Sequence, residues 1–328
     1  MRVGLTYDLK SDYLAMGFSA EAAAEFDRPD TIDGIEEALR ALGCETDRIG
    51  HAKRLTERLV VGDRWDLVFN ICEGVRGVGR EAQVPAILDL YEIPYVFSDP
   101  LVLALTLDKG MTKRVIRDAG VPTSDFCVYS DAGDLDGLRF NGPYFVKPVA
   151  EGTGKGCTAK SVVQSRGDLR AVCDELVSRF GQSALIEPFL AGREFTTGIT
   201  GTGREARVVG TMEVLLLGKA EPGVYSYSNK DQYEDRVRYR LCDPATDPVA
   251  AAAARVALDA WRVLGCRDGG RVDIRCDAAE RPQFLEVNPL AGLNPVHSDL
   301  PILARLAGVG YQELIGRMFA SARRRLKL

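Results

Sequence analysis

The first 98 residues alternate between short apolar segments and longer segments whose apolar residues recur at helical spacing. The short segments have the length and composition of strands, and the longer ones repeat apolar residues at i, i+3 and i+4. In order, the segments are "RVGLTY", "TIDGIEEALRALG", "ETDRIG", "HAKRLTERLV", "WDLVFNI", "EAQVPAILDLY" and "PYVF". This alternation predicts an α/β fold with a Rossmann-like parallel sheet covered on both faces by helices. Ligands bind such a sheet at the carboxyl ends of its strands.

The rest of the chain mixes strands and helices without regular alternation, which predicts α+β structure. Residues 99–188 contain two short helices, then strands such as "YFVKPVA" and "SALIEPF" around one longer helix. The following part is strand-rich to about residue 216, irregular over 217–240 and helical over 247–264. We therefore predict three domains, which span residues 1–98, 99–188 and 189–328.

Charge and cysteine usage narrow the class of protein. The chain has 328 residues, a net charge of −5 and well-mixed acids and bases, so no basic surface for nucleic acid is expected. No apolar run is long enough to span a membrane, and "MRVGLTYDL" is typical of a first strand rather than a secretory signal. Eight scattered cysteines without a C-x-x-C pair indicate reduced thiols. A cytoplasmic enzyme is expected.

Three oxygen-bearing side chains converge in a predicted hairpin near the C-terminal part of the chain. In "FLEVNPLAGL", Glu286 and Asn288 share one face of a strand that Pro289 ends. The upstream strand "GGRVDIRCD" places Arg271 and Asp273 on a single face. Oxygen ligands suit Mg²⁺, and an arginine beside them can neutralise phosphate or an oxyanion. The alternative is a surface salt-bridge ladder between paired strands.

Two other stretches indicate a nucleotide. "YFVKPVAEGTGKGC" places Lys147 near the end of a strand, before a glycine-rich loop whose N–H groups can close over phosphates. In "LIEPFLAGREFT", Glu187 and Glu194 can hydrogen-bond an adenine amino group and ribose hydroxyls. The alternatives are a plain hairpin turn and two exposed acids that flank a turn.

Taken together and in order, these stretches resemble the ATP-grasp superfamily, and specifically the D-alanine–D-alanine ligase family. The resemblance extends over nearly the whole chain in colinear order. It is carried by "LDK", "VKP" with its glycine loop, "IEPFLAGREFT", "YSNKD", "GGRVDIRCD" and "LEVNPLAGLNP".

The resemblance implies an ATP-grasp fold and a role for each matching residue. The phosphates of ATP would be contacted by Lys109, Lys147 and Lys230. The nucleotide site also includes Thr153 and Gly154 of the loop, Glu187, Leu190 and Glu194. Asp273, Glu286 and Asn288 would bind two Mg²⁺ ions, with Mn²⁺ as the alternative metal. Arg271 would stabilise the acyl phosphate and the tetrahedral intermediate. The resemblance also suggests a homodimer.

The chain departs from the family where substrates bind. The first loop, "YDLKSDYLAMGFSAEAAAEFDRPD", is longer, Glu73 replaces a histidine, Thr153 replaces a serine, and Asp231 replaces a tyrosine. Glu73 falls at the carboxyl edge of the first sheet, where it would attract an ammonium group. Glu81 would serve the same end, or would only stabilise the start of the next helix.

These patterns predict an ATP-dependent ligase that joins an amino acid or another small carboxylic acid to an amine through an acyl phosphate. The irregular stretch "EPGVYSYSNKDQYEDR" is predicted to be a lid that excludes water. One alternative is a true D-alanine–D-alanine ligase, and another is a catalytically silent ATP-binding regulator. The complete set of arginine and metal-binding residues argues against the regulator.

Overall fold

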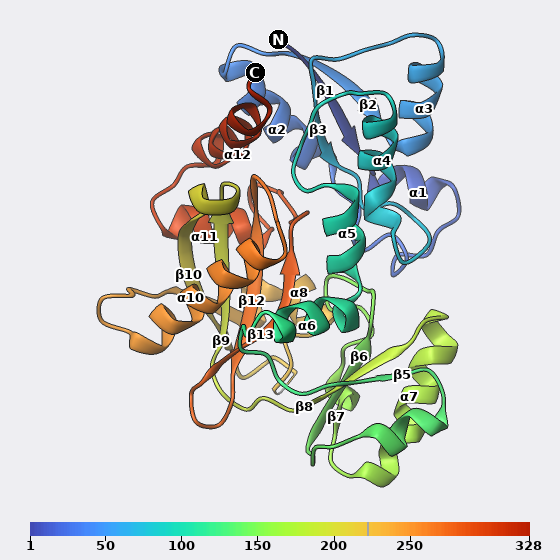
Figure 1. Ribbon diagram of the computed structural model, residues 1–328, viewed down its shortest axis with the longest axis vertical. Helices are drawn as coiled ribbons and strands as arrows, with labels where there is room; N and C mark the ends of the chain where they lie inside the picture. The colour runs from blue at the N-terminus through green and yellow to red at the C-terminus, as the bar shows by residue number, and fades with distance from the viewer. Residues whose placement is uncertain (222) are drawn as a thin grey trace.

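The first sheet is parallel, as the alternating pattern predicts. The computed structural model describes residues 1–221 and 223–328, apart from the side chains of Tyr227 and Asp231. The strand order is β2-β1-β3-β4, and every pairing is parallel (Figure 1). Its strands are β1 (Arg2–Tyr7), β2 (Glu45–Gly50), β3 (Leu67–Ile71) and β4 (Tyr95–Val96). Its helices are α1 (Lys10–Ala15), α2 (Pro29–Ala41), α3 (Ala52–Val60) and α4 (Gln83–Leu90), with the 3₁₀ turn η1 (Arg80–Ala82) before α4.

Alternate side chains of β3 point into two separate cores. Leu67 and Phe69 are buried with the apolar side of α2, whereas Val68 is buried with α3 and α4. The helix α12 (Tyr311–Leu326) belongs to the same core as α2, and Figure 1 shows it beside α2 at the end of the molecule where both termini lie. The first sheet therefore completes its core with a helix from the opposite end of the sequence.

The second sheet is antiparallel in the order β5-β8-β6-β7, and α7 covers it. Its apolar core includes Val146, Ile186, Leu169 and Cys173. The elements are β5 (Cys127–Tyr129), β6 (Tyr144–Pro148), β7 (Val162–Val163), α7 (Arg166–Phe180) and β8 (Ala184–Pro188), with short 3₁₀ turns η2 (Ala132–Gly137) and η3 (Ala159–Ser161).

The third sheet is antiparallel in the order β11-β10-β9-β12-β13. On one face α10 buries Trp261 completely, together with Val102 and Ile116 of α5 and α6, while α11 packs near Met212 of β10 in another cluster. The strands are β9 (Glu194–Thr200), β10 (Arg207–Leu216), β11 (Val237–Leu241), β12 (Gly269–Cys276) and β13 (Pro282–Asn288). The helices are α5 (Pro100–Leu107), α6 (Lys109–Asp118), α10 (Pro248–Val263) and α11 (Asp299–Leu306), with η4 (Gly203–Glu205).

The expectation of irregular structure over residues 217–240 holds for the described residues up to 226 and is wrong from Tyr227 on. This stretch contains α8 (Tyr227–Asp231) and α9 (Tyr233–Arg236), and it ends in the edge strand β11. The sequence "VRYRL" hides the strand because only Val237 is buried, while Arg238 and Arg240 face solvent, as charged residues on edge strands do. Helix α1 lies within the long first loop and was also missed.

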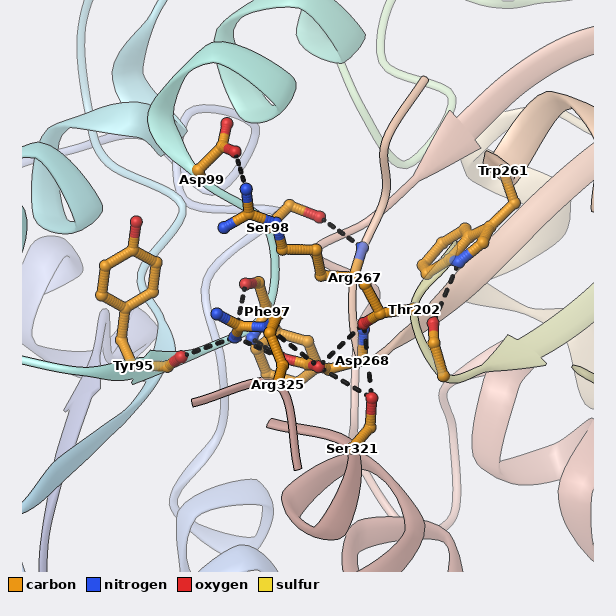
Figure 2. A network of polar contacts seen from close by, with 11 residues as sticks. Tyr95, Phe97, Ser98, Asp99, Thr202, Trp261, Arg267, Asp268, Ser321 and Arg325 are labelled. Atoms are coloured by element: carbon orange, nitrogen blue, oxygen red, sulfur yellow. Dashed lines mark hydrogen bonds and ion pairs between the residues drawn. The ribbon is translucent and has the colours of Figure 1, made fainter. Parts of the chain in front are cut away.

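A polar network joins the first and third sheets (Figure 2). Its centre is Asp268, whose carboxylate is fully buried just before β12. It accepts hydrogen bonds from Arg325 Nη2 at 2.8 Å, Ser321 Oγ at 2.9 Å and the Phe97 amide at 2.9 Å. The same Arg325 nitrogen donates to the Tyr95 carbonyl at 2.9 Å. A buried carboxylate needs such partners, so the network fixes β4 and α12 to the start of β12.

The three sheets fall in successive parts of the chain, but the boundaries 1–98, 99–188 and 189–328 stay a prediction. Helices α5 and α6, from the predicted middle domain, pack in the core of the third sheet. Within the described residues, no helix combines the length and apolar character needed to cross a membrane.

Candidate active site

The β12–β13 hairpin assembles the predicted metal-binding residues. Its register pairs Arg271 with Asn288 and Asp273 with Glu286, so all four side chains lie on one face. Asn288 Nδ2 lies 3.3 Å from Asp273 Oδ2, which leaves the amide oxygen of Asn288 available. The predicted hairpin is therefore confirmed. Two carboxylates and an amide oxygen form a donor set of the chemistry that Mg²⁺ prefers.

A β-bulge interrupts the regular pairing of this hairpin next to Asp273. The register shifts between Asp273 and Ile274, so Ile274 pairs with Phe284 and Leu285 has no partner residue. Such an extra residue bends the strand and redirects side chains. As a result, Leu285 and Glu286 both line the same cleft.

That cleft lies between the second and third sheets and has an empty volume of about 830 Å³, part of it open to solvent. It brings together residues from segments far apart in the sequence. Such a volume is large enough for a nucleotide-sized ligand. The predicted residues that line it are Lys109, Lys147, Gly154, Glu187, Leu190, Glu194, Lys230, Asp273 and Glu286.

A buried ion-pair cluster holds Lys147 at the wall of this cleft. Glu187 Oε2 lies 2.9 Å from Lys147 Nζ, and Glu187 Oε1 lies 2.5 Å from Lys113 Nζ and accepts from Ser124 Oγ at 3.0 Å. Burial opposes ionisation of Glu187, but the two lysines outweigh it and lower its pKa to about 2. Both carboxylate oxygens of Glu187 are thus engaged by protein groups. Lys113 was missed, although it follows Lys109 by one helical turn and so shares its face.

Glu194 faces the cleft from the start of β9. Its Oε2 lies 3.1 Å from Arg275 Nη1, and burial, more than this arginine can offset, raises its pKa. Arg275 also donates to the Gly223 carbonyl at 3.0 Å. Glu194 and Arg275 therefore connect the sheet to the stretch that was predicted to be a lid.

The glycine-rich loop bends sharply and is anchored on the first loop of the chain. Thr153 and Gly154 have φ values of +50° and +75°, which favour glycine. The Gly152 amide donates to Glu25 Oε1 at 2.6 Å, and a side chain at Gly152 would meet that oxygen. Glu25 also pairs with Arg80 at 3.0 Å. One of the loop's N–H groups therefore binds protein rather than phosphate.

A second cavity, of about 640 Å³, lies at the carboxyl edge of the first sheet. Glu73 and Glu81 line it, as do Arg271, Glu286 and Asn288. Among the described residues, neither Glu73 nor Glu81 has an ion-pair partner within 4 Å. Burial and then repulsion from Glu81 raise the pKa of Glu73 well above its usual range. Burial also raises the pKa of Glu81 to about 7, against the opposing charge of Arg80.

The raised pKa of Glu81 predicts a pH-dependent stability. A carboxyl whose pKa is higher in the folded state stabilises the fold below its unfolded pKa, and this contribution is lost as pH rises through the folded value. We expect Glu81→Gln to have a higher Tm than the unchanged protein at pH 8 and nearly the same Tm at pH 5. Thermal melts at both pH values measure this. Glu37→Gln, at an exposed site on α2, is the control, and an equal Tm difference at both pH values would contradict the assignment.

A third cavity, of about 750 Å³, shares Arg271, Thr153 and Gly292 with the second as lining residues. Its lining includes Tyr225, Tyr239, Ser298 and Asp299. Arg271 is buried, and although burial opposes its charge, Asp273 and Asp299 raise its pKa, so it remains a guanidinium. Sequence reasoning predicted that Arg271 and Asp273 share a face, and the hairpin register confirms this. It missed Asp299, which has no distinguishing local pattern.

The fold and this cleft between two antiparallel sheets define an ATP-grasp protein. The family model described as "D-ala D-ala ligase C-terminus" matches residues 115–320. The D-alanine–D-alanine ligase of Bordetella petrii is 32% identical over 283 residues, which cover 86% of this chain and 83% of the relative. An uncharacterised protein of Sinorhizobium fredii is 33% identical over 262 residues, 79% of this chain and 75% of that one. The chain belongs to the D-alanine–D-alanine ligase family.

Solved structures show the same fold at lower identity. The D-alanine–D-alanine ligase of Bacillus anthracis, crystallised with ATP, has a TM-score of 0.73 and 21% identity and covers 100% of this chain and 99% of its own. The VanG D-Ala:D-Ser ligase of Enterococcus faecalis has a TM-score of 0.74 and 17% identity and covers 98% and 99%. The expected ATP-grasp fold is confirmed.

Proposed function

We propose that this protein is an ATP-dependent, ADP-forming ligase that joins the carboxylate of a small molecule to an amine through an acyl phosphate. One observation carries the proposal. Glu286 lines both the first cleft and the second cavity, and Arg271 lines both the second and the third cavity. Three binding spaces, for nucleotide, acyl donor and amine acceptor, therefore share charged side chains, which also include Lys109 and Lys230.

Each step of the reaction uses one of these spaces. A carboxylate oxygen of the donor attacks the γ-phosphorus, and the bond from that phosphorus to the β-phosphate oxygen breaks, so ADP leaves. The acceptor nitrogen then attacks the acyl carbon of the mixed anhydride. Phosphate leaves as the amide forms, and it accepts the proton that the nitrogen loses. Arg271, between the donor and acceptor cavities, stabilises the charge on the tetrahedral oxygen.

The nucleotide-binding residues divide by charge. Lys109, Lys147 and Lys230 bind the phosphates, while Glu194 and the backbone after Glu187 face the base and ribose. Thr153 and Gly154 cover the phosphates from the loop, with Leu190 against the base.

Asp273, Glu286 and Asn288 would hold two Mg²⁺ ions, or Mn²⁺ ions. When bound, the metal would neutralise negative charge on the β- and γ-phosphates. The donor set supports this because all its ligating atoms are oxygens on one strand face.

Glu73 and Glu81 favour an acyl donor that carries an ammonium group, such as an amino acid. Relatives bear the name D-alanine–D-alanine ligase, so D-alanine is the first candidate for both substrates. We expect Glu73→Gln to raise the KM of the amino-bearing donor by about 10- to 100-fold, the effect of losing one charge-assisted hydrogen bond. The KM for ATP should stay nearly unchanged.

The matched control for Glu73→Gln is a donor in which a hydroxyl replaces the ammonium. Its KM should not rise in the variant. An unchanged KM for the amino-bearing donor, with the fold intact by circular dichroism, would rule out Glu73 as the ammonium partner.

The proposed reaction is tested by phosphate release from ATP across a panel of D- and L-amino acids, hydroxy acids and amines. Strong turnover with D-alanine alone would make this chain a D-alanine–D-alanine ligase in the strict sense. Absence of turnover with every combination would favour a nucleotide-binding regulator. The homodimer and the cytoplasmic location remain predictions.

A further inference from the structure

Arg271 is held by two carboxylates on the same nitrogen. Its Nη1 lies 3.0 Å from Asp299 Oδ2 and 3.3 Å from Asp273 Oδ2. Among the described residues, no protein acceptor contacts Nε or Nη2 of Arg271. The guanidinium is therefore fixed by one corner, and its other N–H groups are free to bind reacting atoms in the adjoining cavities.

The two carboxylates differ in what else they must do. Asp273 accepts from Thr196 Oγ1 at 2.8 Å and from Asn288, and it is one of the proposed metal-binding residues. Its negative charge is therefore shared with a cation in the working enzyme. Asp299, at the first position of α11, lines only the acceptor side and makes the shorter contact with Arg271. Asp299 is thus the partner that keeps its charge for Arg271.

Asp299 is in turn held by two tyrosines. Its Oδ1 accepts from Tyr225 Oη at 3.1 Å and from Tyr239 Oη at 3.2 Å, and the two hydroxyls lie 2.6 Å apart. Tyr239 belongs to β11 of the third sheet. Tyr225 belongs to the segment predicted to be a lid, which spans residues 221–236. Of this segment, Pro222 and the side chains of Tyr227 and Asp231 lie outside the described residues.

The segment around Tyr225 has an internal scaffold of its own. Asn229 is fully buried and bonds the Glu221 amide at 2.9 Å and the Val224 carbonyl at 2.7 Å. Lys230 Nζ, which lines the nucleotide cleft, lies 4.5 Å from the centre of the Tyr225 ring. One compact segment therefore lines the nucleotide cleft with Lys230 and Tyr225, and Tyr225 also contacts Asp299, the partner of Arg271.

We propose that Asp299 is a positioning residue for Arg271, and that Tyr225 makes this positioning depend on the seated 221–236 segment. The inference rests on the proposed function, in which Arg271 stabilises the reacting oxygen. The chain Tyr225–Asp299–Arg271 aligns the arginine only when the segment covers the site. Activation of the donor is thereby coupled to exclusion of water.

The test is kinetic, with ATP and the donor and acceptor that give the highest turnover in the panel. Asp299→Asn and Tyr225→Phe should each lower kcat by about 10- to 100-fold, as loss of an orienting group does. In Asp299→Asn the KM for ATP should change less than about twofold, because Asp299 does not line the nucleotide cleft, whereas Tyr225 does. The control is Asp99→Asn, because Asp99 also lies at a helix start and pairs with an arginine, Arg267, but lines none of the three cavities. Asp99→Asn should keep the kcat of the unchanged protein.

A double variant separates positioning from a general structural role. If Asp299 acts through Arg271, Asp299→Asn added to Arg271→Ala should cause no further loss of kcat. The proposal would be overturned if the fold-losses of kcat in the two single variants multiply in the double variant, or if kcat is unchanged in Asp299→Asn.

A second measurement decides the proposal even if no substrate pair turns over. Backbone hydrogen exchange over residues 223–236 should be faster in Asp299→Asn and in Tyr225→Phe than in the unchanged protein and in Asp99→Asn. Equal exchange in all four proteins would overturn the link to the segment. Absence of turnover in the unchanged protein would count against the proposed ligase alone.

Discussion

Glu286→Gln is expected to reduce turnover by about 10³-fold, because a metal ion contributes several kcal/mol of charge stabilisation to phosphoryl transfer. Burial opposes ionisation of Glu286, yet Lys109, Lys147, Lys230 and Arg271 lower its pKa to about 2. It is therefore a carboxylate at neutral pH. In the free protein, loss of this negative charge leaves the surrounding cations to repel one another. In the working enzyme, it removes one of the carboxylates that would bind the metal.

Steady-state rates and thermal melts at several Mg²⁺ concentrations, with and without ATP, test this. The Tm of the unchanged protein should rise when Mg²⁺ and ATP are added together, and the Tm of Glu286→Gln should rise much less. Asn288→Asp should also lose turnover, because it changes the charge of the donor set. Stability and turnover that fall in proportion would show that Glu286 and Asn288 are structural.

Arg271→Ala is expected to lower kcat by about 10²–10³-fold, the usual effect of removing one oxyanion donor, with little effect on ATP affinity. Arg271 lines the donor and acceptor cavities and does not line the nucleotide cleft. Its loss should therefore affect the transition state more than nucleotide binding.

The control for Arg271→Ala lies four residues along the same strand. Arg275 lines the nucleotide cleft and pairs with Glu194, so Arg275→Ala should raise the KM for ATP more than it lowers kcat. If Arg271→Ala loses ATP binding while turnover at saturation survives, Arg271 is a nucleotide-binding residue and its assigned role is wrong.

Local periodicity accounts for what the sequence could predict. The period of two in a strand places Asp273 opposite Glu286 once the hairpin is recognised, and the alternation of strand and helix predicts the parallel first sheet. Lys147, Glu187 and Glu194 came from local motifs at strand ends, whereas Lys109 and Lys230, which begin or lie within helices α6 and α8, came from the family resemblance. Their roles as ligands of ATP and metal stay predictions.

Contacts between distant segments account for what the sequence could not predict. The pairing of Glu187 with Lys113 joins residues 74 positions apart, and no local pattern specifies it. The same holds for Asp299 with Tyr225, and for the bulge that turns Leu285 toward the cleft. The strand β11 was missed because its exposed arginines resemble a loop, although its position at the sheet edge explains them.

The helix α12 has a consequence for how this protein is made. The core of the first sheet includes Met318 and Phe319, and the Asp268 network needs Arg325. These residues are synthesised after roughly 200 further residues have followed β4, which takes roughly 10 to 40 seconds at typical translation rates. During that time the newly made first sheet exposes apolar surface on the ribosome. We therefore expect the core of the first sheet to be completed only once α12 is made, and a nascent chain arrested before residue 311 to engage chaperones.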